Sequence, residues 1–187
     1  MKATSTDRTI EALRRARRIA QLRGRPGTIA SLVPELSDAD ARRIYAEETG
    51  ERAHQGQMPW HVAKCFSTFD LHRKYSMVAG ARICLIAAGF DDPTSQIAAF
   101  EEVRRIAART RTAVSDDAFT FDRCFVLHRH VDSARIVRLL RCSSCGSSYI
   151  KSLGEPYEFD ECHVCKILKF GRGRRVAGGV RRAGERR

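Results

Sequence analysis

Four cysteines near the end of the chain are spaced as two metal-binding turns. Cys142 and Cys145 form one Cys-x-x-Cys turn, and sixteen residues separate it from a second turn made by Cys162 and Cys165. Each turn brings two thiolates to one ion at about 2.3 Å, and the two turns together complete a closed tetrahedral site. A closed site leaves no coordination position for a substrate, so we expect a single structural Zn²⁺. A rubredoxin-like iron centre uses the same ligands and is the alternative.

The remaining thiols and imidazoles give no comparable pattern. His128 and His130 fall on opposite sides of a predicted helix, and we expect His163, inside the second cysteine turn, to be exposed. Three free cysteines lie on or beside apolar helical stripes and are expected to be buried: Cys65, Cys84 and Cys124. The sequence shows no paired carboxylates, nucleophile–base spacing or phosphate-binding glycine loop, so an enzyme is not expected.

The charge of the chain points to an acidic partner. With 34 Lys and Arg against 22 Asp and Glu, the formal net charge is +12 and the isoelectric point is near 9.9. Nucleic acid is the first candidate partner and a membrane surface is the second. Most of the excess lies at residues 166–187, which contain nine basic residues and one acidic residue, a net charge of +8. The glycine- and arginine-rich part from residue 171 onward is expected to be disordered in the free protein.

The sequence predicts a soluble protein of the cytoplasm. Its longest apolar stretch, residues 83–90, is far shorter than the roughly 20 residues that cross a membrane. The amino terminus leads directly into charged residues and lacks the apolar core of a secretion signal. A reducing compartment also favours metal-bound cysteines over disulfides.

Helical periodicity dominates the first 135 residues. Apolar residues recur every three or four positions from Arg8 to Arg23. A short apolar helix from Thr28 to Val33 is followed by a break and by a second helix between Ser37 and Gly50. This order of helix, tight turn and helix is typical of a helix-turn-helix. Further helices are expected over residues 61–89, 93–111 and 118–134.

The cysteine turns are expected to lie in a small ribbon. Short strands are predicted at Ser148–Lys151 and Tyr157–Phe159, between the two turns. The predicted fold is therefore mainly α, with a helix-turn-helix-like amino-terminal region and a small carboxy-terminal four-cysteine zinc ribbon. We divide the chain into a helical DNA-binding and partner-docking body (1–135), a zinc-ribbon module (136–170) and a disordered arginine-rich tail (171–187).

Basic residues in three places are candidates for contacts with DNA. They fall on the outer side of the first helix, in the helix that opens at Ser37, and after the last cysteine: Arg14, Arg15, Arg18, Arg42, Arg43, Lys166, Lys169, Arg172, Arg174 and Arg175. Arginines and lysines in such positions neutralise phosphates, whereas contacts with base edges determine which sequence is bound. A solvated helix face is the alternative explanation for the arginines of the first helix.

The order of these features resembles the flagellar transcriptional activator FlhC family over nearly the whole chain up to Cys165. The likeness rests on the basic first helix, Leu36-Ser37 and Ile44-Tyr45 in the helix that ends at Gly50, Met58-Pro59-Trp60, the stretch from Leu127 to Ile136, and the spacing of the four cysteines. The resemblance implies a predominantly helical protein with a structural zinc ion. It also implies assembly with FlhD into a heterohexamer, which binds double-stranded promoter DNA and recruits RNA polymerase at flagellar class II operons.

The chain departs from this family in the helix that opens at Ser37. Asp38 and Asp40 stand where family members usually carry basic residues, and Ala46 and Thr49 replace further basic positions. Carboxylates close to phosphates are unfavourable. These departures indicate a divergent member or a paralogue, for which two other functions stay open: an RNA-binding zinc ribbon, or an assembly subunit without sequence-specific DNA reading.

Overall fold

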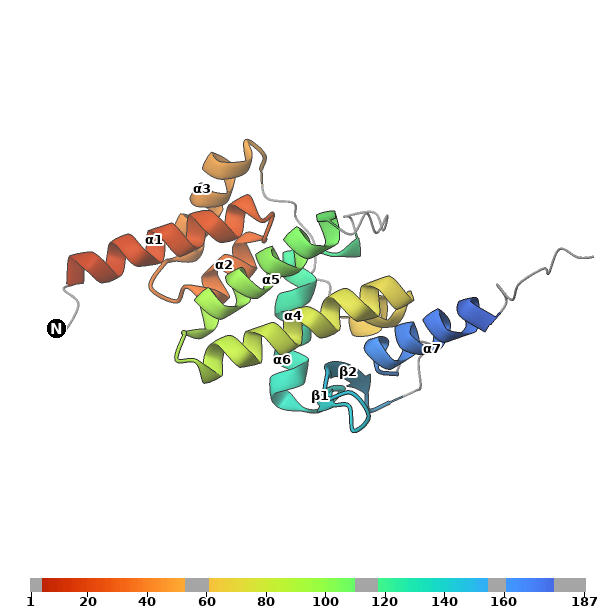
Figure 1. The fold of residues 1–187 in the computed structure, drawn as a ribbon. Coiled ribbons are helices and arrows are strands. Elements are labelled where there is room, and N and C mark those ends of the chain that lie inside the picture. Colours follow the sequence, from red (N-terminus) through yellow and green to blue (C-terminus); the bar gives the residue numbers. More distant parts are fainter. Residues whose placement is uncertain (1–4, 53–60, 110–117, 155–160, 177–187) are drawn as a thin grey trace, which may run out of the picture.

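Helices make up most of the computed structural model, which describes residues 5–52, 61–109, 118–154 and 161–176. A helical body carries a two-stranded hairpin on one side, and the last helix projects away from the body (Figure 1). The elements of the described residues are α1 Ser5–Gln21, α2 Pro26–Leu32, α3 Asp38–Thr49, the 3₁₀ helix η1 Val62–Phe66, α4 Phe69–Ala87, α5 Asp92–Arg109, α6 Phe121–Ser133, β1 Val137–Arg141, β2 Ser148–Ser152 and α7 His163–Val176. The predicted mainly α fold is confirmed.

The first three helices form the predicted amino-terminal unit. Pro26 begins α2, where its fixed φ suits the helix and its missing N–H is not needed. Ser37 caps α3 by accepting a hydrogen bond from the Asp40 amide (3.2 Å). Gly50 ends α3 in the left-handed conformation (φ 70°), which glycine adopts without strain. The inner face of α3 is buried as expected through Ala41, Ile44 and Tyr45.

The prediction of a single helix from residue 61 to 89 is wrong, because the helical conformation is interrupted before Phe69. Residues 62–66 form η1, and α4 begins only after Thr68, whose side chain accepts a hydrogen bond from the Leu71 amide (3.2 Å). Thr68 has an extended backbone, and its cap satisfies an amide at the start of a new helix. The interruption turns Phe66 into the core, where it is 1% exposed.

Helices α4, α5 and α6 form the centre of the body. The predicted boundary between α4 and α5 is confirmed, with Gly89 in the left-handed region (φ 93°) and α5 opening at Asp92. The Tyr75 hydroxyl donates to the Ala118 carbonyl (2.7 Å), so the polar end of this fully buried side chain has a partner. A cluster of aromatic rings packs between these helices: Tyr75, Phe100, Phe119 and Phe121.

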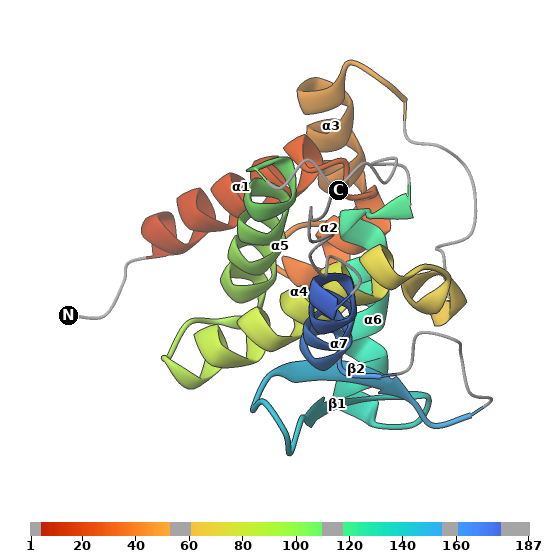
Figure 2. The ribbon, with the colours of Figure 1, turned by 45° about the vertical axis from the view of Figure 1, so that its right-hand side comes forward.

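Strands β1 and β2 pair antiparallel into a hairpin whose turn contains the first two cysteines (Figure 2). Val137 and Ile150 are fully buried and belong to the same hydrophobic core as the helices, so the hairpin has no core of its own. The sequence predicted β2 but missed β1, which precedes the first cysteine turn. The strand predicted at Tyr157–Phe159 lies outside the described residues.

Candidate metal centre and basic surfaces

The four predicted metal ligands come together between the turn of the hairpin and the start of α7. Their Sγ atoms all lie within 4.8 Å of one another. Cys142 Sγ is 3.6 Å from Cys165 Sγ, and Cys145 Sγ is 3.5 Å from Cys162 Sγ. A tetrahedral ion with sulfur ligands at about 2.3 Å needs sulfur–sulfur separations of roughly 3.8 Å, whereas a disulfide needs about 2.05 Å. The cluster therefore fits one metal ion and not two disulfides.

Hydrogen bonds already favour the anionic form of two of these thiols. The amides of Ser144 and Cys145 lower the pKa of Cys142, and the hydroxyl and amide of Ser147 lower the pKa of Cys145 to about 6. Close approach to Cys142 and Cys145 raises the pKa of Cys165 to about 12. A cation between the sulfurs would lower the pKa of Cys165, because cysteine binds a metal ion as the thiolate.

One face of α4 holds the hairpin in place. His72 Nε2 is 2.9 Å from the Ile150 carbonyl oxygen, and the Ser76 hydroxyl accepts a hydrogen bond from the Ile150 amide (3.2 Å). One turn further along, Gly80 lies against Ser148, and a Cβ added at Gly80 would be only 3.1 Å from the Ser148 Cβ. Residues four apart share a helix face, so this strip fixes the metal-binding turn to the helical body.

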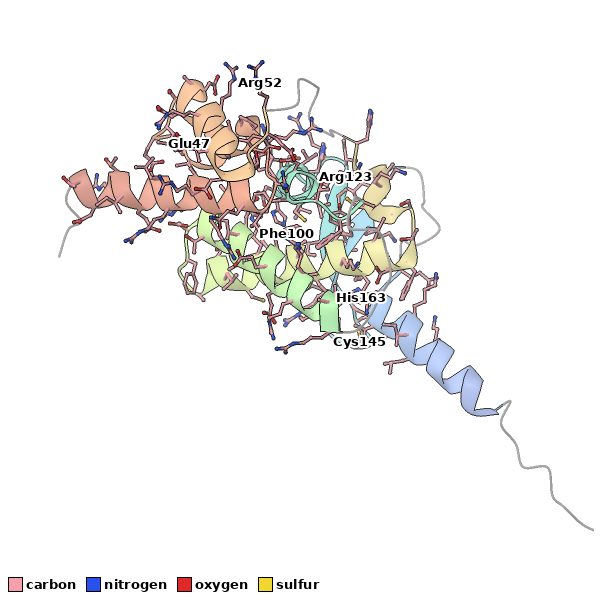
Figure 3. The ribbon with its side chains drawn as sticks, turned by 90° about the horizontal axis from the view of Figure 1, so that it is seen from above. Glu47, Arg52, Phe100, Arg123, Cys145 and His163 are labelled. Atoms are coloured by element: carbon pink, nitrogen blue, oxygen red, sulfur yellow. The ribbon has the colours of Figure 1, made fainter. Side chains whose placement is uncertain are left out.

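His163 is buried, which corrects the expectation that it is exposed. It is 6% exposed, and its ring lies edge-on to that of His72 with the centroids 6.4 Å apart. Burial lowers the pKa of His163 to about 4. The physical reason is that α7 starts at this residue and packs its first turn against α4. Figure 3 shows His163 and Cys145 close together at the start of α7.

Two of the three candidate arginines of α1 contact carboxylates at or before α5. Arg15 contacts Asp91, just before α5, at 2.7 Å and Glu11 of its own helix at 3.3 Å. Arg18 pairs with Glu101 of α5. Arg14 is 3.9 Å from Glu11, and its side chain is 75% exposed. Two of these three arginines are therefore partly neutralised by carboxylates from elsewhere in the body.

Helix α3 carries more acidic than basic residues. Arg43 is 3.2 Å from Asp40 and 3.2 Å from Glu47, while Arg42 is exposed and forms no ion pair with a described residue. Four carboxylates and two arginines give residues 38–49 a net charge of −2. Such a helix approaches phosphates less favourably than a basic one does.

The candidates after the last cysteine lie on α7. Lys169 is exposed, and Lys166 Nζ is 5.9 Å from the centroid of the Phe69 ring, a cation–π contact between α7 and α4. α7 also contains three arginines, Arg172, Arg174 and Arg175. Residues 171–176, assigned to the tail from the sequence, thus belong to α7, and residues 177–187 lie outside the described residues. Figures 1 and 3 show α3 and α7 at opposite ends of the molecule, so the predicted DNA-binding residues do not form one surface.

Sequence reasoning missed a buried arginine that links three helices. The Arg82 side chain is 6% exposed; its Nε donates to Asp92 (2.7 Å), and its two terminal nitrogens donate to the two carboxylate oxygens of Asp132 (2.8 Å each). It thereby joins α4 to the start of α5 and the last turn of α6. The available signal was its position four residues after Val78, on the buried face of α4.

The free cysteines differ from one another. Cys65 and Cys124 are buried as predicted, and burial raises the pKa of Cys65 to about 12. Cys84 is exposed, which corrects the prediction. It lies near the end of α4 beside Ile83 and Ile86, which are 41% and 37% exposed, because this end of the helix extends past the face that its neighbours cover.

Comparison with known proteins places these features in a family. The sequence model of the flagellar transcriptional activator (FlhC) family matches residues 1–177, a range that contains all four cysteines and every helix and strand of the structure. A comparison with curated protein sequences found no match. Within the described residues, no helix combines the length and the apolar character that a membrane span needs. The chain belongs to the flagellar transcriptional activator (FlhC) family, which is a family of transcription regulators and not of enzymes.

Proposed function

We propose that the chain is a cytoplasmic DNA-binding transcriptional activator that acts with an FlhD-like partner in a heterohexamer. In this proposal the complex binds flagellar class II promoters and recruits RNA polymerase to them. The observation that carries the proposal is the family match over residues 1–177. The four clustered cysteines are consistent with it, because they lie within the matched range and form a site that could hold one metal ion.

We infer that the metal of the four-cysteine cluster is Zn²⁺ with a structural role. All four ligands are soft sulfur atoms, which favour zinc or iron, and a closed four-sulfur site offers no position for a substrate. Elemental analysis of the purified protein is expected to find one zinc per chain. One iron per chain, together with the red colour of an iron–thiolate centre, would overturn the assignment.

The metal ties the hairpin turn to the start of α7. Cys142 and Cys145 lie in the turn of the hairpin. Cys162 is the residue before α7, and Cys165 lies in the first turn of that helix. The hairpin itself is fixed to α4 through Ile150. Together with the contacts of His163 and Lys166 with α4, the metal would fix where α7 begins relative to the body, and the basic residues of α7 make this region a candidate for binding nucleic acid.

Titration of the metal-loaded protein with DNA tests the proposal. The complex with a co-expressed FlhD-like partner is titrated with a flagellar promoter fragment and with a scrambled duplex of the same length, each at two salt concentrations. Phosphate contacts are lost as salt rises, whereas contacts that read the sequence persist. Tighter binding to the promoter at both salt concentrations is expected. Equal, salt-sensitive binding to both duplexes would refute sequence-specific activation.

A second function, that of an assembly subunit whose partner reads the DNA, is favoured by one observation. Helix α3 has a net charge of −2, and Arg43 is already paired with two carboxylates of the same helix. Changing Arg43 to Ala distinguishes the two functions. If α3 reads bases, the variant loses discrimination between promoter and scrambled DNA; if the partner reads them, the variant discriminates as well as the unmodified chain does.

A further inference from the structure

The hairpin and the residues that lead into it carry an unusual charge pattern. Residues 133–154 contain four cations, Arg135, Arg138, Arg141 and Lys151, and no aspartate or glutamate. All four are exposed, and none forms an ion pair with another described residue. The excess positive charge of this segment is therefore available to an acidic ligand.

Two of these cations lie directly opposite each other. In the hairpin register Arg138 pairs with Lys151, and the neighbouring outward pair is Leu140 with Tyr149. Side chains alternate between the faces of a strand, so the buried Ile150 and its partner face the body while these two pairs face away from it. Like charges directly opposite on two strands destabilise a sheet. A bound anion would relieve this repulsion between Arg138 and Lys151, which have no ion pair within the described residues.

Several arginines of α1 and α3, unlike the cations of the hairpin, are paired with carboxylates. Arg15 and Arg18 on α1 and Arg43 on α3 each contact at least one carboxylate of the body. The hairpin lies at the other side of the molecule from α3 (Figures 1 and 2). Arg42 of α3 is exposed and has no ion pair with a described residue, but its helix has a net charge of −2, whereas residues 133–154 carry four cations and no carboxylate.

A structural explanation accounts for only part of the pattern. A zinc ion with four thiolates has a net charge of −2, and Arg141, next to Cys142, is placed to offset it. Arg138 is four residues before Cys142, which corresponds to about 13 Å along a strand. That distance exceeds the screening length of about 8 Å at physiological salt. Compensation of the metal centre therefore does not explain the pair of Arg138 and Lys151.

We propose that the outward face of the hairpin, centred on Arg138 and Lys151, binds the phosphate backbone of double-stranded DNA. The inference rests on the proposed function, since it assigns the phosphate-binding surface of a DNA-binding activator. Cα atoms of directly opposite residues in an antiparallel pair are about 4.5–5.5 Å apart. The two cations can thus donate to one phosphate or to two adjacent phosphates, and they contribute affinity without choosing a sequence.

The test compares two double variants of the full-length, metal-loaded protein in complex with its partner. Arg138→Gln/Lys151→Gln removes the hairpin pair, and Arg105→Gln/Arg109→Gln removes the same charge from exposed positions of α5. Each phosphate contact contributes about 0.9 to the slope of log K against log salt. Loss of two contacts is expected to reduce the slope by about 1.8 and to weaken binding about thirtyfold at 0.15 M salt. The α5 variant is expected to change neither value appreciably.

A charge-exchange variant and a fold measurement complete the design. Arg138→Lys/Lys151→Arg keeps both charges and is expected to bind as the unmodified protein does. Metal content and the midpoint of thermal unfolding establish that each variant is folded. If the unmodified complex binds no DNA, both the proposed function and this inference fail. If it binds DNA and the hairpin variant keeps its affinity and slope, only the inference fails. A loss confined to RNA ligands would likewise overturn it.

Discussion

The ion pairs of Arg82 allow a sharp test of the packing between α4, α5 and α6. The guanidinium is buried, with a side chain that is 6% exposed, whereas its partners Asp92 and Asp132 are 45% and 48% exposed. Asp132→Ala breaks the two hydrogen bonds between Arg82 and Asp132, Arg82→Met breaks these and the bond to Asp92, and the two changes leave different groups behind. Asp132→Ala leaves a buried cation with a single partner, while Arg82→Met leaves two carboxylates that water can solvate.

This asymmetry determines the expected magnitudes. An uncompensated buried charge costs about 3–5 kcal/mol, and Asp92 remains to offset part of that cost. We therefore expect Asp132→Ala to lower the free energy of unfolding by about 2–3 kcal/mol. Half-exposed carboxylates are well screened, and methionine retains much of the packing of the arginine stem, so Arg82→Met is expected to cost only about 1–2 kcal/mol. The double variant should resemble Arg82→Met, because the second change then leaves no buried charge.

Urea unfolding of the metal-loaded protein, followed by circular dichroism, measures these differences. The four proteins of the cycle are compared at one pH and one salt concentration, and an unchanged dependence on urea shows that the unfolded states are comparable. Arg105→Met is the control, since Arg105 and Glu102 form an exposed pair within α5, whose loss is expected to leave the free energy of unfolding nearly unchanged. A larger loss for Arg82→Met than for Asp132→Ala would refute the argument from the buried charge.

Four further outcomes are expected. Cys145→Ser should abolish stoichiometric metal binding and speed amide exchange in α7 far more than in α4; retained metal would contradict the four-ligand site. His128 is 1% exposed, and its burial lowers its pKa to about 3 from an ordinary 6.5, so the stability it provides above pH 6.5 is lost as pH falls toward 3. Between pH 7 and pH 5 the free energy of unfolding in urea should fall by about 2 kcal/mol more for the unmodified protein than for His128→Leu. The same pH dependence in both proteins would contradict this. Ending the chain after Phe170 removes seven arginines and one glutamate, and anisotropy titrations should show weaker binding to all DNA sequences with a shallower salt slope; unchanged affinity would exclude a role for these residues. Arg138→Glu places opposite charges across the hairpin, so it should stabilise the protein by about 0.2–1 kcal/mol in thermal unfolding while weakening DNA binding. A loss of both stability and DNA affinity would show that Arg138 acts through the fold.

Features with a local cause could be predicted from the sequence. The cysteine ligands follow from the geometry of a Cys-x-x-Cys turn, which needs only neighbouring residues to place two sulfurs. The cap at Ser37 and the stop at Gly50 were also predictable, because a capping side chain and a left-handed glycine act within one helical turn. The buried face of α3 followed from its periodicity.

Other features could not be predicted because their cause lies elsewhere in the chain. The periodicity from residue 61 to 89 continues through Thr68, and only the packing of Phe66 into the core reveals the break. Strand β1 is not bounded by the glycine or proline that usually marks a strand, and it forms because β2 pairs with it. His163 is buried by α4, which is some ninety residues earlier in the sequence.

The basic residues show most clearly why a charge pattern alone does not locate a binding surface. Arg18 pairs with Glu101, 83 residues away, and Arg82 pairs with Asp132, 50 residues away. Both look like ordinary surface cations in the sequence, yet the fold supplies their counter-ions. Arg138 has no special sequence context, but its strand neighbour is another cation and the surrounding 22 residues contain no carboxylate. Pairing within the structure therefore separates cations that hold the fold, such as Arg18 and Arg82, from cations left exposed to a ligand, and it is the reason why we propose the hairpin as the surface that binds an acidic partner.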